Sequence, residues 1–496
     1  MRRLAVPLAP AGIRASALII SLALGGCAVG PDYAREPAPV APTFKELKGW
    51  KLANPSDASQ RGEWWSPYRD PKLSLLLQQV EVSNQTVLGM AAAYEQARAI
   101  IREAQAALFP TATGSYSVVR TRTGPNFGTG SGGGGSALYT TTYTGALSGA
   151  WDLDVWGKVR RQIESNTAAA QVNAADLDNA KLSAQAQLGI AYFNLRAADS
   201  LADLLRKTVA EYKRTLTITE NQYKAGVVSR ADVITAETQV LNVEAQLINV
   251  GVQRAQFEHS IAVLAGRPPA ELSIAPHLLG SQIPKIPIIV PSTLLERRPD
   301  IAAAERMMQQ QNALIGVAIA AYFPDISLSG LLEFAGKEPL PFSAAHGLWS
   351  LGATATETVF DGGLRGAQVD AARAVYWQAV ATYRQTVLTA MQQVEDQMAA
   401  IRILTQQLVV QRKAVKAARE AVDVYLNQYR AGTVAFTTVV TAEAILLVDE
   451  EAELTIRQSL YVASVTLIEA LGGGWDTTLL PTAPELEKGF SLLPQL

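Results

Sequence analysis

Residues 221–226 read NQYKAG and residues 427–432 read NQYRAG, so nearly the same hexapeptide occurs twice, 206 positions apart. Long stretches of helical composition flank both copies. Each Ala-Gly pair is expected to end one helix and to begin the turn to the next, because glycine accepts the positive φ that such a reversal needs. The spacing continues without a gap to two further matches: residues 235–237 with 441–443, and Gly266 with Gly472. A repeat of this length far exceeds the 20–50 residues of solenoid units, so it predicts duplication of a whole domain.

Both halves of the chain are expected to follow one order: helix, strand hairpin, long helix, Ala-Gly turn, helix. Phe109-Pro110 and Phe323-Pro324 end the first helix of each half, the earlier one running from about residue 72 to 108. The long helix at about 157–224 would measure about 100 Å at 1.5 Å per residue. The expected segments are a signal peptide at 1–26, a lipid-anchored proline-rich tether at 27–63, a first repeat at 64–266, a crossover at 267–298, a second repeat at 299–474 and a C-terminal tail at 475–496.

The strands are expected to be amphipathic and unusually long. Residues 138–155 (LYTTTYTGALSGAWDLDV) alternate between an apolar and a polar parity. Soluble strands usually have about 5–6 residues. The four expected strands are at about 110–124, 138–155, 325–334 and 347–360.

Four such strands cannot form a closed barrel, for which about eight is the small end. An open sheet edge in lipid would leave backbone groups unpaired. We therefore expect three copies to close a barrel of twelve strands, four from each chain, with the helices extending from it as a second tube. The expected fold class is mainly α with a membrane β-barrel part.

The N-terminal sequence indicates export. Arg2 and Arg3 precede an apolar stretch at residues 15–24, as in a signal peptide. Cys27 is the only cysteine, which excludes a disulfide within the chain and a thiolate metal cluster. Its place behind a signal peptide and two glycines resembles the lipobox of bacterial lipoproteins, which implies a lipid anchor. Ala28 stands where inner-membrane lipoproteins usually have aspartate, so the resemblance implies the outer membrane.

The composition and the remaining motifs point away from other functions. With 43 basic and 45 acidic side chains the net charge is −2, which argues against a nucleic-acid partner. After the N-terminus no run of about 18 apolar residues predicts a transmembrane helix. Residues 128–133 fit the dinucleotide fingerprint, but strands are expected on both sides of them where the motif needs a strand and a helix. Asp152 and Asp154 are expected to be a lumen-facing acidic pair rather than an acid–base pair. We expect no catalytic residue, no cofactor and no metal.

Taken together, the motifs resemble the TolC-like outer-membrane efflux factor family, in its NodT-type lipoprotein branch. In chain order they are residues 29–33 (VGPDY) after Cys27, 109–110 (FP), 151–157 (WDLDVWG), 297–301 (RRPDI), 323–324 (FP), 360–363 (FDGG) and the two Ala-Gly turns. The resemblance implies a homotrimer with a twelve-stranded barrel in outer-membrane lipid and a long periplasmic α-helical barrel. It also implies two protein partners, a periplasmic adaptor and an inner-membrane transporter, commonly of the resistance-nodulation-division class, and no catalytic chemistry.

The same resemblance places the Ala-Gly turns at the far periplasmic tip, where the tube closes and the adaptor docks. Family members often carry aspartates six and nine residues after the second glycine, where this chain has Thr438 and Thr441; the first turn keeps one acid, Asp232. We therefore expect a closed end with weaker cation selectivity than the family pattern implies. The residues expected to set it are Asp232, Arg230, Tyr223 and Tyr429. The full set of expected tip residues is Tyr223, Ala225, Gly226, Arg230, Asp232, Tyr429, Ala431, Gly432, Thr438 and Thr441.

The expected function is a passive exit duct, across the outer membrane, for drugs or other small toxic compounds. Two alternatives remain open: the exit duct of a type I protein secretion system, and a lipid-anchored periplasmic coiled-coil scaffold in which the strands form a side domain. The length of the alternating stretch at 138–155 favours a duct, because a membrane crossing takes about 9–11 tilted residues.

Overall fold

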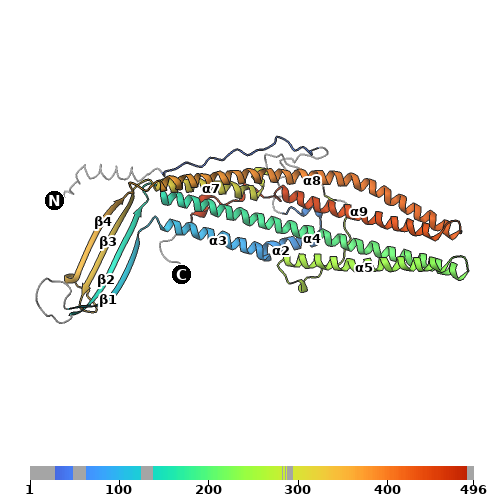
Figure 1. The fold of residues 1–496 in the computed structure, drawn as a ribbon, viewed down its shortest axis with the longest axis horizontal. Helices are drawn as coiled ribbons and strands as arrows, with labels where there is room; N and C mark the ends of the chain where they lie inside the picture. Colours follow the sequence, from blue (N-terminus) through green and yellow to red (C-terminus); the bar gives the residue numbers. More distant parts are fainter. Residues whose placement is uncertain are drawn as a thin grey trace, which may run out of the picture.

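The computed structural model describes residues 28–47, 63–124, 138–281, 283–284, 286 and 294–488. The expected signal peptide and Cys27 lie outside the described residues. The described chain is an elongated body with a four-stranded sheet at one end and long helices running away from it (Figure 1). None of the described helices is both long enough and apolar enough to cross a membrane.

The two halves repeat the same elements with matching lengths. The long helices α4 and α8 have 67 residues each, and the helices that follow them, α5 and α9, have 35 each. This confirms the duplicated order of helix, hairpin, long helix and helix. The first half contains α2 (Pro71–Ser83), α3 (Gln85–Ala106), β1 (Thr111–Thr123), β2 (Leu138–Leu153), α4 (Lys158–Lys224) and α5 (Arg230–Leu264). The second contains α6 (Leu294–Arg297), α7 (Pro299–Ala320), β3 (Asp325–Gly336), β4 (Gly347–Thr356), α8 (Leu364–Arg430) and α9 (Phe436–Ala470), and a short α10 (Ala483–Leu486) follows.

The single helix expected from about residue 72 to 108 is wrong, because Asn84 divides it into α2 and α3. Asn84 is extended, with ψ 122°, and its side chain accepts hydrogen bonds from the N–H groups of Thr86 and Val87, as an N-cap does. Its amide also donates to the carbonyl of Leu264 at 2.8 Å. The break therefore docks on the end of α5, where a side chain at Gly266 would collide with Ser83.

The sheet has the order β1-β2-β3-β4, with every pair antiparallel. Because directly paired residues point to the same side, the register defines two faces. On the apolar face the paired rows include Val118 with Tyr143, Leu147 with Leu332, Trp151 with Leu328, and Leu332 with Trp349. On the polar face they include Ser117 with Thr144, Thr113 with Ser148, Asp152 with Ser327, and Ser327 with Thr354.

Two strands end earlier than expected. β2 ends at Leu153 because the Asp154 carboxylate turns to the start of α4, accepting hydrogen bonds from the N–H groups of Val159 and Arg160 at 2.8 and 3.1 Å. β4 ends at Thr356, which pairs with Asp325, the first residue of β3. Since the partner strand stops there, the residues up to 360 have no ladder to join.

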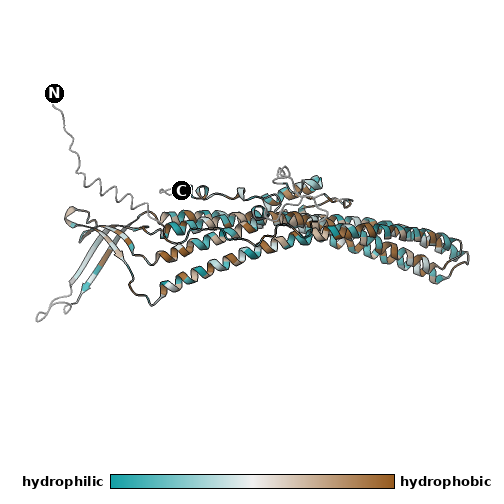
Figure 2. Cartoon of the chain, turned by 90° about the horizontal axis from the view of Figure 1, so that it is seen from above, coloured by the Kyte–Doolittle hydropathy of each residue, from teal (hydrophilic) through white to brown (hydrophobic). Residues whose placement is uncertain are grey.

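Hydrophobic residues gather where the helices pack, most densely near the middle of the helical body (Figure 2). The described part of the expected tether, residues 28–47, lies along α7 and α8 (Figure 1). Phe44 is buried, Tyr33 donates a hydrogen bond to Glu305 at 2.7 Å, and Glu46 pairs with Arg402 at 2.5 Å. This segment is extended, and both its side chains and its backbone groups hold it against the helices.

Candidate functional site: the paired hairpin tips and the groove between them

Helices α4 and α5 form one long helical hairpin, and α8 and α9 form a second. Both helical hairpins turn at the end of the molecule farthest from the sheet, and we call these two turns the tips (Figure 1). The two turns have the same backbone hydrogen bonds, those of a Schellman motif. Gly226 donates to the carbonyl of Tyr223 and Val227 to that of Gln222, both at 2.9 Å, and Gly432 and Thr433 do the same in the second copy. Gly226 and Gly432 have φ of +73° and +74°, and a Cβ on either would touch nothing within 4 Å. The glycines are therefore required for backbone conformation and not for space.

The helices that leave the two turns begin differently. Ser229 and Asp232 form a capping box at the start of α5: the Asp232 carboxylate accepts from the Ser229 N–H at 3.0 Å and from its hydroxyl at 2.8 Å. In the second copy Ala435 and Thr438 occupy these positions, and α9 has no side-chain cap. The carboxylate expected at a charged tip thus also stabilises the helix end locally.

The two tip tyrosines lie in different environments. Tyr429 is 3% exposed and packs against Phe436 with ring centroids 5.2 Å apart, in a cluster that includes Ala236 of α5. Its hydroxyl lies 3.4 Å from that of Thr219 on α4, and burial raises its pKa. Tyr223, at the same place in the first copy, is 45% exposed. The structure therefore uses one tyrosine to join the hairpins and leaves the other on the surface.

The other expected tip residues are placed as follows. Arg230 and Ala431 are exposed, and Thr441 donates its hydroxyl hydrogen bond to the carbonyl of Thr437 within its own helix. Ala225 and Ala431 are the C-caps of α4 and α8. Asp232 lies near Tyr429 of the same chain. Burial is the main cause of the raised pKa of Tyr429, and the negative charge of Asp232 adds to it.

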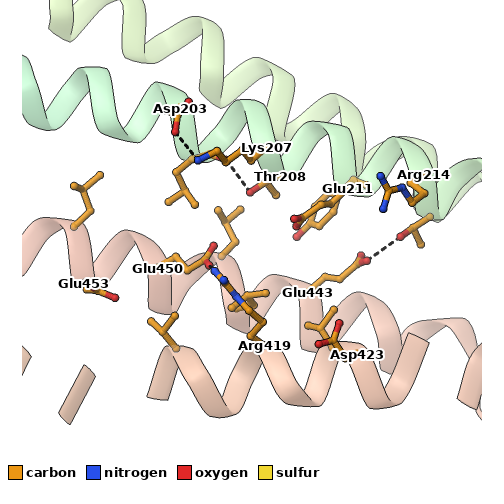
Figure 3. Close-up of a pocket in the computed structure, with 18 of the residues that line it drawn as sticks. Asp203, Lys207, Thr208, Glu211, Arg214, Arg419, Asp423, Glu443, Glu450 and Glu453 are labelled. Carbon is orange, nitrogen blue, oxygen red and sulfur yellow. Dashed lines mark hydrogen bonds and ion pairs between the residues drawn. The ribbon is translucent and has the colours of Figure 1, made fainter. Parts of the chain in front are cut away.

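Behind the tips, a groove of about 950 Å³ separates α4 from α8 and α9 (Figure 3). Its walls are rich in charge. Asp203 pairs with Lys207 at 2.8 Å along α4, and Arg419 of α8 pairs with Glu450 of α9. The charged side chains that line it are Asp203, Lys207, Glu211, Arg214, Arg419, Asp423, Arg430, Glu443, Glu450, Glu453 and Arg457.

Glu443 of α9 is the buried acid of this groove. It is 7% exposed and accepts a hydrogen bond from the Thr215 hydroxyl of α4 at 3.0 Å. Burial raises its pKa from an ordinary 4.5 to about 7; the Thr215 hydrogen bond opposes this shift and the Glu211 charge adds to it. Within the described part of the chain no cation pairs with Glu443. The sequence contained only one hint of this residue, the TAE match at 235–237 and 441–443, which says nothing of burial.

The acidic pair expected in the lumen is wrong for Asp154. Its side chain is 8% exposed and pairs with Arg160 at 3.1 Å, so it fixes the junction of β2 and α4. Asp152 stays on the polar face opposite Ser327. Over the described ranges, no group of three or more His, Cys, Asp or Glu side chains is arranged to hold a metal ion. The Gly-rich residues 128–133 lie outside those ranges.

Comparison with known proteins identifies the class of the chain. Residues 76–267 and 290–473, one segment in each half, match the family described as outer membrane efflux protein. The chain belongs to this family. It is the outer-membrane channel component of an efflux pump and extends into the periplasm, and its relatives are channel proteins rather than enzymes.

Individual relatives agree over almost the whole length. The toluene efflux pump outer membrane protein TtgC of Pseudomonas putida is 30% identical over 464 residues, which cover 93% of this chain and 95% of the relative. The cation efflux system protein CusC of Escherichia coli is 27% identical over 468 residues, covering 92% and 98%. Among solved structures, the outer-membrane channel OprN superposes with a TM-score of 0.82 at 31% identity, covering 90% of this chain and all of the other. The CmeC outer membrane channel of Campylobacter jejuni, at 22% identity and a TM-score of 0.82, supports the fold alone.

Proposed function

We propose that three copies of this chain close a twelve-stranded barrel in the outer membrane and a helical tube beneath it, forming a continuous exit duct. The supporting observation is the sheet itself. It has an apolar and a polar face, and in the described chain β1 and β4 each pair along one edge only. Those open edges need partner strands in lipid. β1 and β2, with 13 and 16 residues, are long enough for a tilted crossing of about 9–11.

We also propose that Cys27 carries the lipid anchor. Val29 donates a backbone hydrogen bond to the carbonyl of Trp156 at 3.0 Å, three residues beyond the last residue of β2. Ala28 packs closely against Gly157: a Cβ added to Gly157 would lie 2.6 Å from the Cα of Ala28. An acyl chain on Cys27 would therefore enter the membrane next to the periplasmic end of the barrel.

The proposed exit duct also implies two protein partners. The two hairpin tips would contact a periplasmic adaptor, and the adaptor would connect the duct to an inner-membrane transporter, of the resistance-nodulation-division class. The cargo would be small molecules, since the relatives are named for efflux of toluene, antibiotics and cations and for export of pyoverdine. These names favour small-molecule efflux over type I protein secretion, and a membrane duct over a scaffold.

The resting gate is proposed to lie at the tips, with Asp232, Arg230, Tyr223 and Tyr429 around the closed end. If the Asp232 charge attracts cations there, Asp232→Asn lowers single-channel conductance and its dependence on the cation. Ser229→Ala is the matched control, because it weakens the capping box without removing charge. Unchanged conductance and cation dependence in Asp232→Asn would rule out this role.

The duct is tested by extracting the protein with detergent from outer membranes, measuring its mass, and inserting it into planar bilayers. We expect a trimer that conducts ions. The Cys27→Ala variant should still be a trimer that leaves the membrane only with detergent, because the barrel alone holds it in lipid. A monomer released without detergent after this substitution would support the scaffold and refute the duct.

A further inference from the structure

Two arginines lie on the apolar face of the sheet, near the end of β1 farthest from the helices. Arg120 pairs with Thr141 and Arg122 with Tyr139, in the rows just beyond the pair of Val118 and Tyr143. By strand alternation both guanidinium groups leave the sheet on the side of Val118 and Tyr143. Under the proposed barrel this is the side that meets lipid.

The two side chains converge on one aromatic ring. The guanidinium carbon of Arg120 lies 5.5 Å from the centre of the Tyr139 ring, and that of Arg122 lies 5.8 Å from it. At these distances the ring attracts each guanidinium group. The N–H donors at its edge remain available, and their fork matches the oxygen atoms of a phosphate.

No acidic group neutralises the pair in the described structure. Neither Arg120 nor Arg122 has a carboxylate within 4 Å among the described residues. The connection from β1 to β2, residues 124–137, has the sequence GPNFGTGSGGGGSA and contains no acid. Glu338 adjoins Pro339, whose carbonyl accepts a hydrogen bond from Tyr116 on the same face, but it forms no described ion pair with either arginine. Among the described residues, the pair is therefore a local positive charge without a counter-ion.

The position of the pair along the strand corresponds to the outer membrane surface. Arg120 is nine residues beyond Thr111, which lies at the helical end of β1. At about 3.3 Å per residue this is about 30 Å of strand. A tilt of about 40° reduces it to about 23 Å along the membrane normal, close to the height of about 25 Å that outward apolar bands usually have. An arginine in the middle of that band would be costly, whereas one at its rim reaches the headgroups at little cost.

We propose that Arg120 and Arg122, held by Tyr139, bind the phosphate groups of a phosphorylated lipid headgroup in the outer leaflet. The inference rests on the proposed barrel, which places this face against lipid. Binding is non-covalent: the guanidinium N–H groups donate hydrogen bonds to phosphate oxygens while the acyl chains lie along the apolar rows below. The site would fix the height of the barrel in the membrane.

The test compares the purified trimer with Arg120→Ala/Arg122→Ala in nanodiscs of phosphatidylcholine that contain bisphosphorylated lipid A. Lipid A bound per trimer is measured by native mass spectrometry. We expect the double variant to bind about tenfold less, and Arg120→Lys/Arg122→Lys to retain part of the binding, because lysine keeps the charge but not the bidentate fork. Arg373→Ala, on the exposed surface of α8, is the control and should bind as the wild type does.

Each other outcome overturns the proposal in a recognisable way. Equal lipid A binding by the wild type and the double variant, with both trimers conducting, refutes the site and leaves the duct intact. Displacement of lipid A by millimolar inorganic phosphate would assign the pair to free phosphate instead. A wild-type chain that forms no trimer would refute the duct and the lipid site together.

Discussion

Glu443→Gln is expected to make the closed packing of the two hairpins insensitive to pH. In this structure, which we take as the closed arrangement of the proposed gate, Glu443 is buried between α9 and α4, and burial raises its pKa to about 7. Any opening that separates α4 from α9 hydrates the side chain and returns its pKa toward 4.5. The closed state therefore binds the proton more tightly than the open one, and rising pH favours opening.

The size of the effect follows from the two pKa values. A tenfold difference in proton affinity is worth about 1.4 kcal/mol, so the difference between 4.5 and about 7 corresponds to about 3 kcal/mol for each chain. Because the pKa of Glu443 is raised in the closed state, protonated Glu443 favours closure. This contribution to the free energy of closure is complete below pH 4.5, is lost progressively up to pH 7, and is absent above. The opening equilibrium of the wild type should rise by about two orders of magnitude across this window.

Hydrogen–deuterium exchange of the α9 amides around residue 443 measures this opening directly, after correction for the intrinsic rate at each pH. At pH 8 the neutral glutamine should slow exchange by up to about 100-fold relative to the wild type, while at pH 4.5 the two proteins should match. Glu237→Gln is the matched control. Glu237 occupies the same place in the first repeat but is exposed, so its removal should change nothing.

Two results would refute this reasoning. One is wild-type protection around residue 443 that stays constant from pH 4.5 to 8. The other is a response to Glu237→Gln equal to the response to Glu443→Gln, since that would mean that net charge on the helices, rather than burial at this position, controls the opening.

Five further substitutions test the tips and the packing of the repeats. Ser229→Ala removes a capping hydroxyl and should cost about 1 kcal/mol, seen as faster amide exchange in the first turn of α5 and unchanged exchange in α9. Tyr429→Ala should lower the free energy of unfolding by about 3 kcal/mol or more, because it empties a buried site, whereas Tyr223→Ala should change it by less than about 0.5. Gly432→Ala should cost only about 1–2 kcal/mol for its positive φ, but Gly472→Ala should greatly reduce the yield of folded trimer, because its Cβ would lie 1.8 Å from a backbone carbonyl oxygen.

Much of the fold could be predicted from the sequence because its signals are periodic and long. The 206-residue spacing of residues 221–226 and 427–432 predicted the duplication, and the alternation at 138–155 predicted a strand of unusual length. Helix and strand periods are local properties, so they remain visible without a structure. Two of the errors fell where a single polar side chain serves as a cap. Asn84 broke an expected helix, and Asp154 ended a strand two residues early.

The candidate site was predicted only in part, for a physical reason. Gly226 and Gly432 could be read directly because a left-handed turn demands glycine. The burial of Glu443 and Tyr429 depends on how one hairpin lies against the other, and no local pattern records that arrangement. Their repeat counterparts, Glu237 and Tyr223, are identical residues with the opposite exposure. Sequence alone assigns the two members of each pair the same environment.

The two helical hairpins have the same type of turn, but the helices that follow the turns, α5 and α9, are fixed by different contacts. This difference predicts which helix frays when the tips separate. α5 is fixed locally by Ser229 and Asp232, and these bonds survive separation. α9 begins at Phe436 with no side-chain cap, and Phe436 is buried against Tyr429 instead. The first N–H groups of a helix have no partner within it, so the start of α9 is held by contacts that separation would remove. The same movement hydrates Glu443, two turns further along α9. Opening should therefore begin in the second repeat, where proton loss from one buried acid and the absence of one cap act on the same two turns of helix.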